Sequence, residues 1–243
     1  MSKRTRQVSV GGVLVGGGER VKVQSMTTTK TSDVEGTVRQ IGALEEAGCE
    51  IVRVAVSDEA DAAAVRAVKE RIRLPLVADI HFSPKLAAAA IENGADKVRI
   101  NPGNIGGEKE IKYVADCIRA HGIPVRVGSN TGSIEANFLK KYGRSAEALV
   151  ESALYNVGVL EKFGVTDIVI SVKASSVPLT VRAYTLLSER TDYPLHVGVT
   201  EAGATEAGIV KSAVGIGALL LNGIGDTVRV SLTDDPVREV YAA

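Results

Sequence analysis

The sequence predicts an α/β protein with the (β/α)8 or TIM-barrel architecture. Short runs rich in Val and Ile alternate with longer segments of helical period, and the chain has eight such runs. The runs are apolar almost throughout, as expected for parallel strands that are covered on both faces. Eight such units in 243 residues match the size of one barrel. An open doubly wound sheet is the alternative, and the absence of a GxGxxG motif opening a helix disfavours it.

The expected strands share this β-branched character and are followed by amphipathic segments. They are expected at residues 21–27, 50–56, 74–81, 96–102, 124–130, 167–175, 194–203 and 226–233. After the first strand, Val34, Val38, Ile41 and Leu44 recur at the spacing of one helical face. Several helical segments end in Gly just before the next strand, which is the residue preferred beyond a helix C-terminus. The recurrence of Gly at the ends of successive helical segments supports seven consecutive βα units.

Three segments depart from the repeat. Residues 8–18 (VSVGGVLVGGG) are expected to form a small hairpin that closes the barrel floor. Residues 131–146 make a longer connection than the others, expected to lie over the barrel top as a lid. After the eighth strand, Asp at the N-cap and Pro236 near the first helical position open an eighth helix that stops after about two turns. We therefore expect residues 1–243 to be a single barrel domain with a truncated eighth helix, the N-terminal part of a longer protein.

Composition excludes several functional classes. The 29 basic residues balance the 29 acidic residues, so neither nucleic acid nor an anionic membrane has overall electrostatic support as a partner. Two cysteines are too few for a disulfide framework and favour a reducing compartment. The N-terminus lacks the apolar region of a secretory signal, and the longest apolar tract is interrupted by Gly. We expect a cytoplasmic protein without a membrane span, and the scattered His and Cys residues form no metal-ligand set.

Arginines interrupt four of the apolar strands. They are Arg53, Arg99, Arg126 and Arg229, each between two β-branched residues. Because strand side chains alternate, an arginine points away from the face that its neighbours occupy, here into the barrel lumen near its top. With Lys173, five cations would converge where acids are few, chiefly Asp79 and Glu201. Their repulsion is relieved by a bound polyanion such as a diphosphate, which arginine holds bidentately. Alternatively, each arginine pairs with a nearby carboxylate or extends to the rim.

Other polar residues follow the same strand ends, where the chemistry of (β/α)8 enzymes is located. His81 comes two residues after Asp79, and it is either functional or a hydrogen-bonding structural residue. His196 lies earlier in its strand, deeper in the barrel, and is better interpreted as structural. Glu201 could donate a proton where ligand phosphate neutralises the surrounding cations.

Long motifs along the chain resemble one enzyme family. The segments VQSMT, PLVADIHF, RINPGNIG, PLHVGVTEAG and VKSAVGIGALLLNGIGDTVRVSLTDDP lie between about Arg6 and Pro236. Together they closely resemble the bacterial 4-hydroxy-3-methylbut-2-enyl diphosphate synthase family (IspG/GcpE). The resemblance implies an oxidoreductase acting on CH or CH2 groups in the non-mevalonate (MEP) isoprenoid pathway. Its reaction opens the ring of 2-C-methyl-D-erythritol 2,4-cyclodiphosphate reductively, with loss of water.

The same resemblance implies partners and a cofactor. Family members carry a [4Fe–4S] cluster on a C-terminal domain, held by three Cys and one Glu, and ferredoxin or flavodoxin supplies the electrons. In their head-to-tail homodimer, the cluster domain of one subunit caps the barrel of the other. Neither Cys49 nor Cys117 matches a cluster ligand. We therefore expect this chain by itself to bind no cluster and to have no turnover.

Site residues also follow from the resemblance. Those implied to bind the diphosphate are Arg53, Arg99, Arg126, Lys173, Gln24, Asn101, Asn130 and Ser231. Asp79, His81 and Glu201 match residues near the reacting end of the substrate, with Glu201 as the acid that protonates the departing hydroxyl. Two alternatives stay open: a pterin-binding barrel like dihydropteroate synthase, and a non-catalytic anion-binding barrel. In the second, carboxylates of the same chain would satisfy the rim cations.

Overall fold

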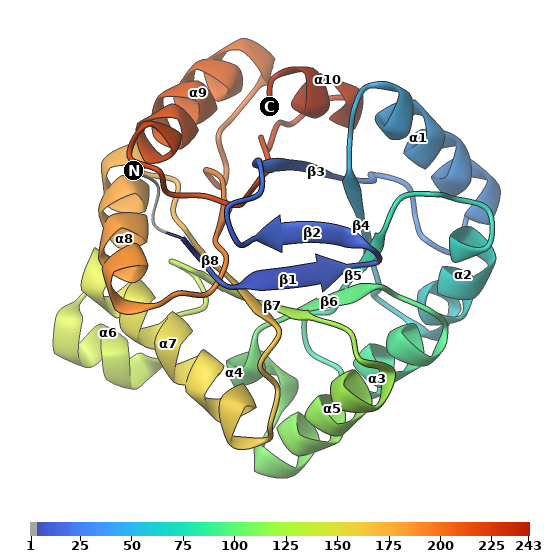
Figure 1. Cartoon of the computed structure of the whole chain (residues 1–243), viewed down its shortest axis with the longest axis horizontal. Coiled ribbons are helices and arrows are strands. Elements are labelled where there is room, and N and C mark those ends of the chain that lie inside the picture. The colour runs from blue at the N-terminus through green and yellow to red at the C-terminus, as the bar shows by residue number, and fades with distance from the viewer. Residues whose placement is uncertain (1–3) are drawn as a thin grey trace.

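The computed structural model describes residues 4–243, and it confirms the predicted barrel (Figure 1). The eight parallel strands run in the order β8-β7-β6-β5-β4-β3-β10-β9 around the sheet. A parallel bridge between Ile170 and Leu195 joins the two ends of this order, so the sheet closes on itself. Closure satisfies the backbone groups that an open sheet leaves at its edges.

The strands agree with the sequence prediction except at the end of the chain. They are β3 Lys22–Met26, β4 Ile51–Ala55, β5 Leu76–Asp79, β6 Lys97–Ile100, β7 Val125–Asn130, β8 Ile168–Lys173, β9 His196–Val197 and β10 Thr227–Val228. The last two are much shorter than the predicted runs 194–203 and 226–233. At Gly198 the backbone comes so close to its neighbours that a Cβ would lie 2.5 Å from the carbonyl oxygen of Arg229. The chain leaves the regular ladder there, which no local apolar pattern reveals.

Helices surround the strands, and most of the longer ones begin at a residue whose side chain caps the first turn. The longer ones are α1 Val34–Glu46, α2 Glu59–Lys69, α3 Pro84–Glu92, α5 Glu108–His121, α7 Ala146–Lys162, α8 Val177–Arg190 and α9 Thr205–Leu221. At the N-terminus of α3, Ser83 accepts a hydrogen bond from the Leu86 amide and Pro84 takes the first helical position. Among residues 4–243, no helix is long and apolar enough to cross a membrane.

The predicted floor hairpin is confirmed. Strands β1 Gln7–Val10 and β2 Val13–Gly16 pair antiparallel across the amino-terminal end of the barrel (Figure 1). Val10 and Val15 are fully buried against Ile51 and Val77, the lowest lumen residues of β4 and β5. An apolar plug therefore seals the floor.

The lid expected from residues 131–146 is not observed. This segment forms α6, Ala136–Tyr142, which packs against α7 at the perimeter of the barrel (Figure 1). The ring of Phe138 meets that of Tyr155 edge-on, with centroids 5.8 Å apart. The apolar side chains of α6 find partners on α7, and this contact holds the segment at the perimeter.

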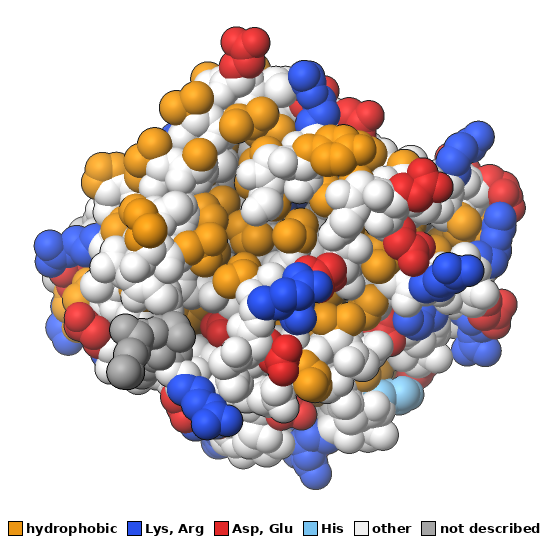
Figure 2. Space-filling model, turned by 45° about the horizontal axis from the view of Figure 1, so that its top comes forward, with side chains coloured by type: hydrophobic (Ala, Val, Ile, Leu, Met, Phe, Trp, Pro, Cys, Tyr) orange, Lys and Arg blue, Asp and Glu red, His pale blue; other side chains and the backbone are white. Residues whose placement is uncertain are grey.

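Two further features distinguish the end of the chain. Helix α10, Pro236–Tyr241, begins as predicted, with Asp235 accepting a hydrogen bond from the Val237 amide. Several hydrophobic side chains of the last two helices are exposed: Val210, Val214 and Leu221 of α9, and Tyr241 of α10. Figure 2 shows such side chains gathered on the face turned toward the viewer. Exposed hydrophobic side chains that gather on one face are typical of protein interaction sites.

Candidate functional site

A cavity of about 290 Å³ opens at the carboxyl ends of the barrel strands. Each strand of the barrel, or the loop that follows it, contributes at least one lining residue. The lining residues are Met26, Arg53, Asp79, His81, Arg99, Arg126, Gly128, Ser129, Asn130, Ser171, Lys173, Thr200, Arg229 and Ser231. Strand register explains the convergence, because Asp79 pairs with Arg99 and Arg99 with Arg126, all on the lumen face of the pleat. The predicted rim of polar side chains is thus one continuous surface.

Most of the residues predicted for the site lie in this cavity. They are Arg53, Asp79, His81, Arg99, Arg126, Asn130, Lys173 and Ser231.

Three predicted residues lie outside it. Gln24 is buried deeper in the barrel, and neither amide atom has a hydrogen-bond partner among the described residues. Asn101 caps the short helix α4, Pro102–Ile105, with Oδ1 accepting from the Gly103 amide. Glu201 is exposed just beyond Thr200 and has a left-handed φ of 50°.

Asp79 is the carboxylate around which the cavity cations are arranged. Its Oδ1 lies 3.1 Å from Nη1 of Arg99, and its Oδ2 lies 3.6 Å from Nε of Arg53 and 3.6 Å from Nε2 of His81. Burial raises the pKa of Asp79, but the charges of the surrounding arginines, with His81 close by, outweigh burial and hold this pKa well below its usual range. Asp79 is therefore ionised at neutral pH and orients two guanidinium groups.

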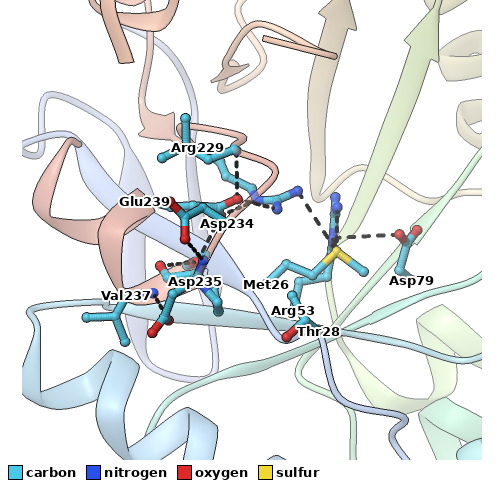
Figure 3. Close-up of polar contacts among 12 residues, drawn as sticks. Met26, Thr28, Arg53, Asp79, Arg229, Asp234, Asp235, Val237 and Glu239 are labelled. Atoms are coloured by element: carbon cyan, nitrogen blue, oxygen red, sulfur yellow. Dashed lines mark hydrogen bonds and ion pairs between the residues drawn. The ribbon is translucent and has the colours of Figure 1, made fainter. Parts of the chain in front are cut away.

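Arg229 has a carboxylate of its own, as Figure 3 shows. Its Nε and Nη2 donate to Oε2 and Oε1 of Glu239 on α10, both at 3.0 Å. Glu239 is 2% exposed and also accepts hydrogen bonds from Ser25 Oγ and the Leu232 amide. For this arginine, the carboxylate-paired alternative is the one observed.

Arg126 and Lys173 have no carboxylate partner among the described residues. Arg126 is 2% exposed, and its Nε and Nη1 make no hydrogen bond. Burial and then repulsion from Arg53 and Arg99 lower the pKa of Arg126, while burial and then Arg126 lower that of Lys173. Five basic side chains thus meet two carboxylates, Asp79 and Glu239, so basic groups outnumber acidic groups by three. A site of this charge favours a polyanionic ligand.

The sequence prediction did not assign every lining residue. Met26 accepts hydrogen bonds at Sδ from Nε and Nη2 of Arg53, at 3.1 and 2.8 Å. Gly128 makes room for Arg99, because a Cβ there would lie 2.9 Å from Nε of that arginine. A glycine inside a buried strand is the available signal for such a close approach. No comparable sequence signal marks Met26, because its sulfur accepts hydrogen bonds from Arg53 of the neighbouring strand β4.

The described residues do not form a metal site. Across residues 4–243, no group of three or more His, Cys, Asp or Glu side chains could hold a metal ion. Cys49 is buried, which raises the pKa of its thiol to about 11. These residues therefore do not fit a four-ligand iron–sulfur cluster.

Together, the fold and the site define the class: a (β/α)8-barrel protein with a cationic mouth at the carboxyl ends of its strands. The sequence model of the GcpE TIM-barrel domain matches residues 5–243, and the chain belongs to the GcpE family.

Curated relatives of the chain share one name. This chain is 58% identical over 241 residues to 4-hydroxy-3-methylbut-2-en-1-yl diphosphate synthase (flavodoxin) of Caldanaerobacter subterraneus subsp. tengcongensis. The match covers 99% of this chain and 68% of that protein. The protein of the same name from Ruminiclostridium cellulolyticum is 54% identical over 238 residues, covering 98% of this chain and 67% of the relative. The chain thus spans about two thirds of the length of these relatives.

Solved structures show a shared fold at low identity. Dihydropteroate synthase from Stenotrophomonas maltophilia superposes with a TM-score of 0.69 and 16% identity, covering 98% of this chain and 96% of that one. Type I 3-dehydroquinate dehydratase from Clostridium difficile superposes with a TM-score of 0.67 and 12% identity, covering 98% of this chain and 97% of that one. Identities this low indicate the barrel alone, so the pterin-binding alternative gains no functional support from them.

Proposed function

We propose that this chain is the substrate-binding barrel of a 4-hydroxy-3-methylbut-2-enyl diphosphate synthase of the non-mevalonate pathway. The substrate would be 2-C-methyl-D-erythritol 2,4-cyclodiphosphate, converted to the linear allylic diphosphate by reductive ring opening and dehydration. The observation that carries the proposal is the excess of three basic side chains over carboxylates around one 290 Å³ cavity. A cyclic diphosphate supplies the opposite charge.

In this proposal, the cations divide the work of binding. Arg126 and Lys173, which lack carboxylate partners within residues 4–243, take the phosphate oxygens directly. Arg53 and Arg99 are held in position by Asp79 and contribute charge from the adjacent strands. Asn130 and Ser231 add polar contacts from two sides of the mouth. Binding in a fixed orientation is the barrel's contribution to catalysis.

Two groups are candidates for proton transfer. His81 is half exposed at the mouth, and its Nε2 faces Asp79, which can hold the imidazole in one orientation. Glu201 directly follows a lining residue, Thr200, and has a left-handed backbone. We assign Glu201 the protonation of the departing hydroxyl. Gln24 and Asn101 would then support the site from below and beside it.

The electrons require a cofactor that the described residues do not hold. We propose that a [4Fe–4S] cluster, with ligands outside this chain, supplies the redox chemistry. The curated relatives have flavodoxin in their names, and flavodoxin or ferredoxin is the proposed donor. The apolar side formed by α9 and α10 supports a homodimeric assembly. Two free cysteines support a cytoplasmic location.

Calorimetry with the cyclodiphosphate tests the binding site. We expect weak binding to this chain and a loss of about tenfold to a hundredfold in Arg126→Ala, because a charge-assisted hydrogen bond contributes about 1.5–3 kcal/mol. Arg182→Ala is the matched control, since Arg182 is an exposed residue of α8 that pairs with Glu147. Equal affinity in wild type and Arg126→Ala would show that the cations are structural.

A reduced-viologen assay tests the cofactor assignment separately. We expect no turnover by this chain alone, because it holds no ligand set for the cluster among its described residues. Turnover without an added cluster-bearing protein would overturn the assignment while leaving the binding site intact.

A further inference from the structure

Below the cavity, a second layer of polar side chains fills the barrel lumen. Gln24 of β3, Lys97 of β6 and His196 of β9 are 1%, 0% and 0% exposed, and none of them lines the cavity. Lys97 precedes Arg99 by two residues on β6, so both side chains face the lumen, with Lys97 one layer lower. The register agrees, because Lys97 pairs with Val77 and Arg99 with Asp79.

Lys97 is a buried amine without a partner. Its Nζ makes no hydrogen bond to any described residue. Such a group is costly as an ammonium ion and much less costly as a neutral amine. No sequence motif indicates that Lys97 is buried, because a lysine at the start of a strand is ordinarily exposed.

The groups that face Lys97 from the surrounding strands help to explain why its pKa is lowered. Arg126 of β7 and Arg53 of β4 act on it as positive charges, and Asp79 of β5 is already engaged by Arg53 and Arg99. On β9, burial and several cations, Lys97 among them, lower the pKa of His196, so His196 stays neutral. Burial first, then Arg126 and Arg53, lower the pKa of Lys97 to about 7.

We propose that Lys97 is a ligand-linked proton acceptor beneath the anion site. Its amine is mainly neutral in the free barrel above neutral pH, and it takes up one proton from solvent when a diphosphate occupies the cavity. The diphosphate cancels the field of Arg126 and Arg53, which removes the repulsion that disfavoured the ammonium form. Lys97 then adds one more positive charge below the anion without touching it. This inference rests on the proposed diphosphate site.

Binding of inorganic pyrophosphate to this chain tests the linkage. Calorimetry in buffers of different ionisation enthalpy measures the protons taken up, and comparison with Lys97→Met cancels the titration of pyrophosphate itself. Near pH 8.5 we expect wild type to take up approaching one proton more than Lys97→Met, and near pH 6 almost none more. The affinity of the variant should be about tenfold lower near pH 6, and the difference should shrink as pH rises.

Thermal unfolding without ligand provides an independent test. Because folding lowers the pKa of Lys97 below its unfolded value of about 10.4, the cost of burying its charge is fully present below about pH 7 and is relieved as pH rises. Lys97→Met should therefore raise Tm near pH 6 by about 4 °C or more, with a smaller gain near pH 9. Lys97→Gln, which keeps a polar group without charge, should show the same pH trend.

The control is Lys109→Met, the same substitution at an exposed lysine of α5, which should change neither Tm nor proton uptake. A lower Tm for ligand-free Lys97→Met, or proton uptake equal to wild type, would overturn the inference. Absence of pyrophosphate binding by wild type would count against the proposed function instead, and the ligand-free comparison would still decide on Lys97.

Discussion

The four lumen arginines differ, at the scale of single residues, in the carboxylate that each one meets. Arg229 has Glu239 to itself, Arg53 and Arg99 share Asp79, and Arg126 has no carboxylate partner among the described residues. All four occupy the same sequence context, between two β-branched residues. Only the partner from a neighbouring strand or helix separates the structural arginine from the one available for a ligand.

Replacement of Asp79 by Asn should destabilise the barrel by about 3–5 kcal/mol at pH 7, because it leaves two buried guanidinium groups without a counter-charge. Since folding lowers the pKa of Asp79, its contribution is present above the unfolded pKa of about 3.9 and is lost as pH falls below that value. Urea unfolding at pH 7 and pH 3 measures both effects.

Asp116→Asn, in an exposed pair with Lys112, is the control for Asp79→Asn and should cost less than about 1 kcal/mol. A stability of Asp79→Asn equal to wild type at pH 7 would mean that the arginines do not depend on Asp79.

At the scale of elements, α10 is short but firmly attached. The helix has six residues, and one of them, Glu239, is only 2% exposed. Glu239 accepts hydrogen bonds from Arg229, Ser25 Oγ and the Leu232 amide. A helix of this length is not stable in isolation, so tertiary contacts hold it. The contact connects α10 directly to one wall of the cavity (Figure 3).

Glu239→Gln should loosen α10, because the neutral amide cannot replace the paired charge. We expect a loss of about 2–4 kcal/mol in unfolding free energy and faster hydrogen exchange at the amides of residues 236–241. Glu206→Gln, an exposed position in the first turn of α9, should leave both nearly unchanged. Unaltered exchange in α10 of Glu239→Gln would show that its apolar contacts suffice to hold the helix.

At the scale of the whole molecule, the barrel has one apolar end and one cationic end. The β1–β2 hairpin seals the floor with Val10 and Val15, while the anion site occupies the opposite mouth. Stability of the floor and ligand binding at the mouth should therefore be separable by mutation.

Val15→Ala should cost about 1–3 kcal/mol, since it removes two buried methyl groups and leaves a small void. Pyrophosphate affinity should stay within about twofold, because the change lies at the far end of the lumen. Leu14→Ala, on the half-exposed face of the same strand, should cost less. A large loss of pyrophosphate affinity in Val15→Ala would mean that packing at the barrel floor affects the anion site.

Prediction from the sequence succeeded where the pattern is local. The floor hairpin, the first six strands and the start of α10 at Asp235 and Pro236 follow from alternation, apolar runs and cap residues. It was wrong for residues 131–146, since contacts with α7 hold α6 at the perimeter. The ends of β9 and β10 were missed because a close backbone approach at Gly198 determines them.

By itself, the sequence determined the barrel, the lumen direction of its arginines and the family, because periodicity, strand alternation and long motifs are properties of the chain order. The tertiary structure alone decided which cations are neutralised, because pairing depends on which side chains meet across strands and helices. It placed Glu239 on Arg229, gave Arg126 no carboxylate from any residue that the structure describes, and buried Lys97 beneath them. Those contacts convert a repeated sequence feature into a site with an excess of positive charge.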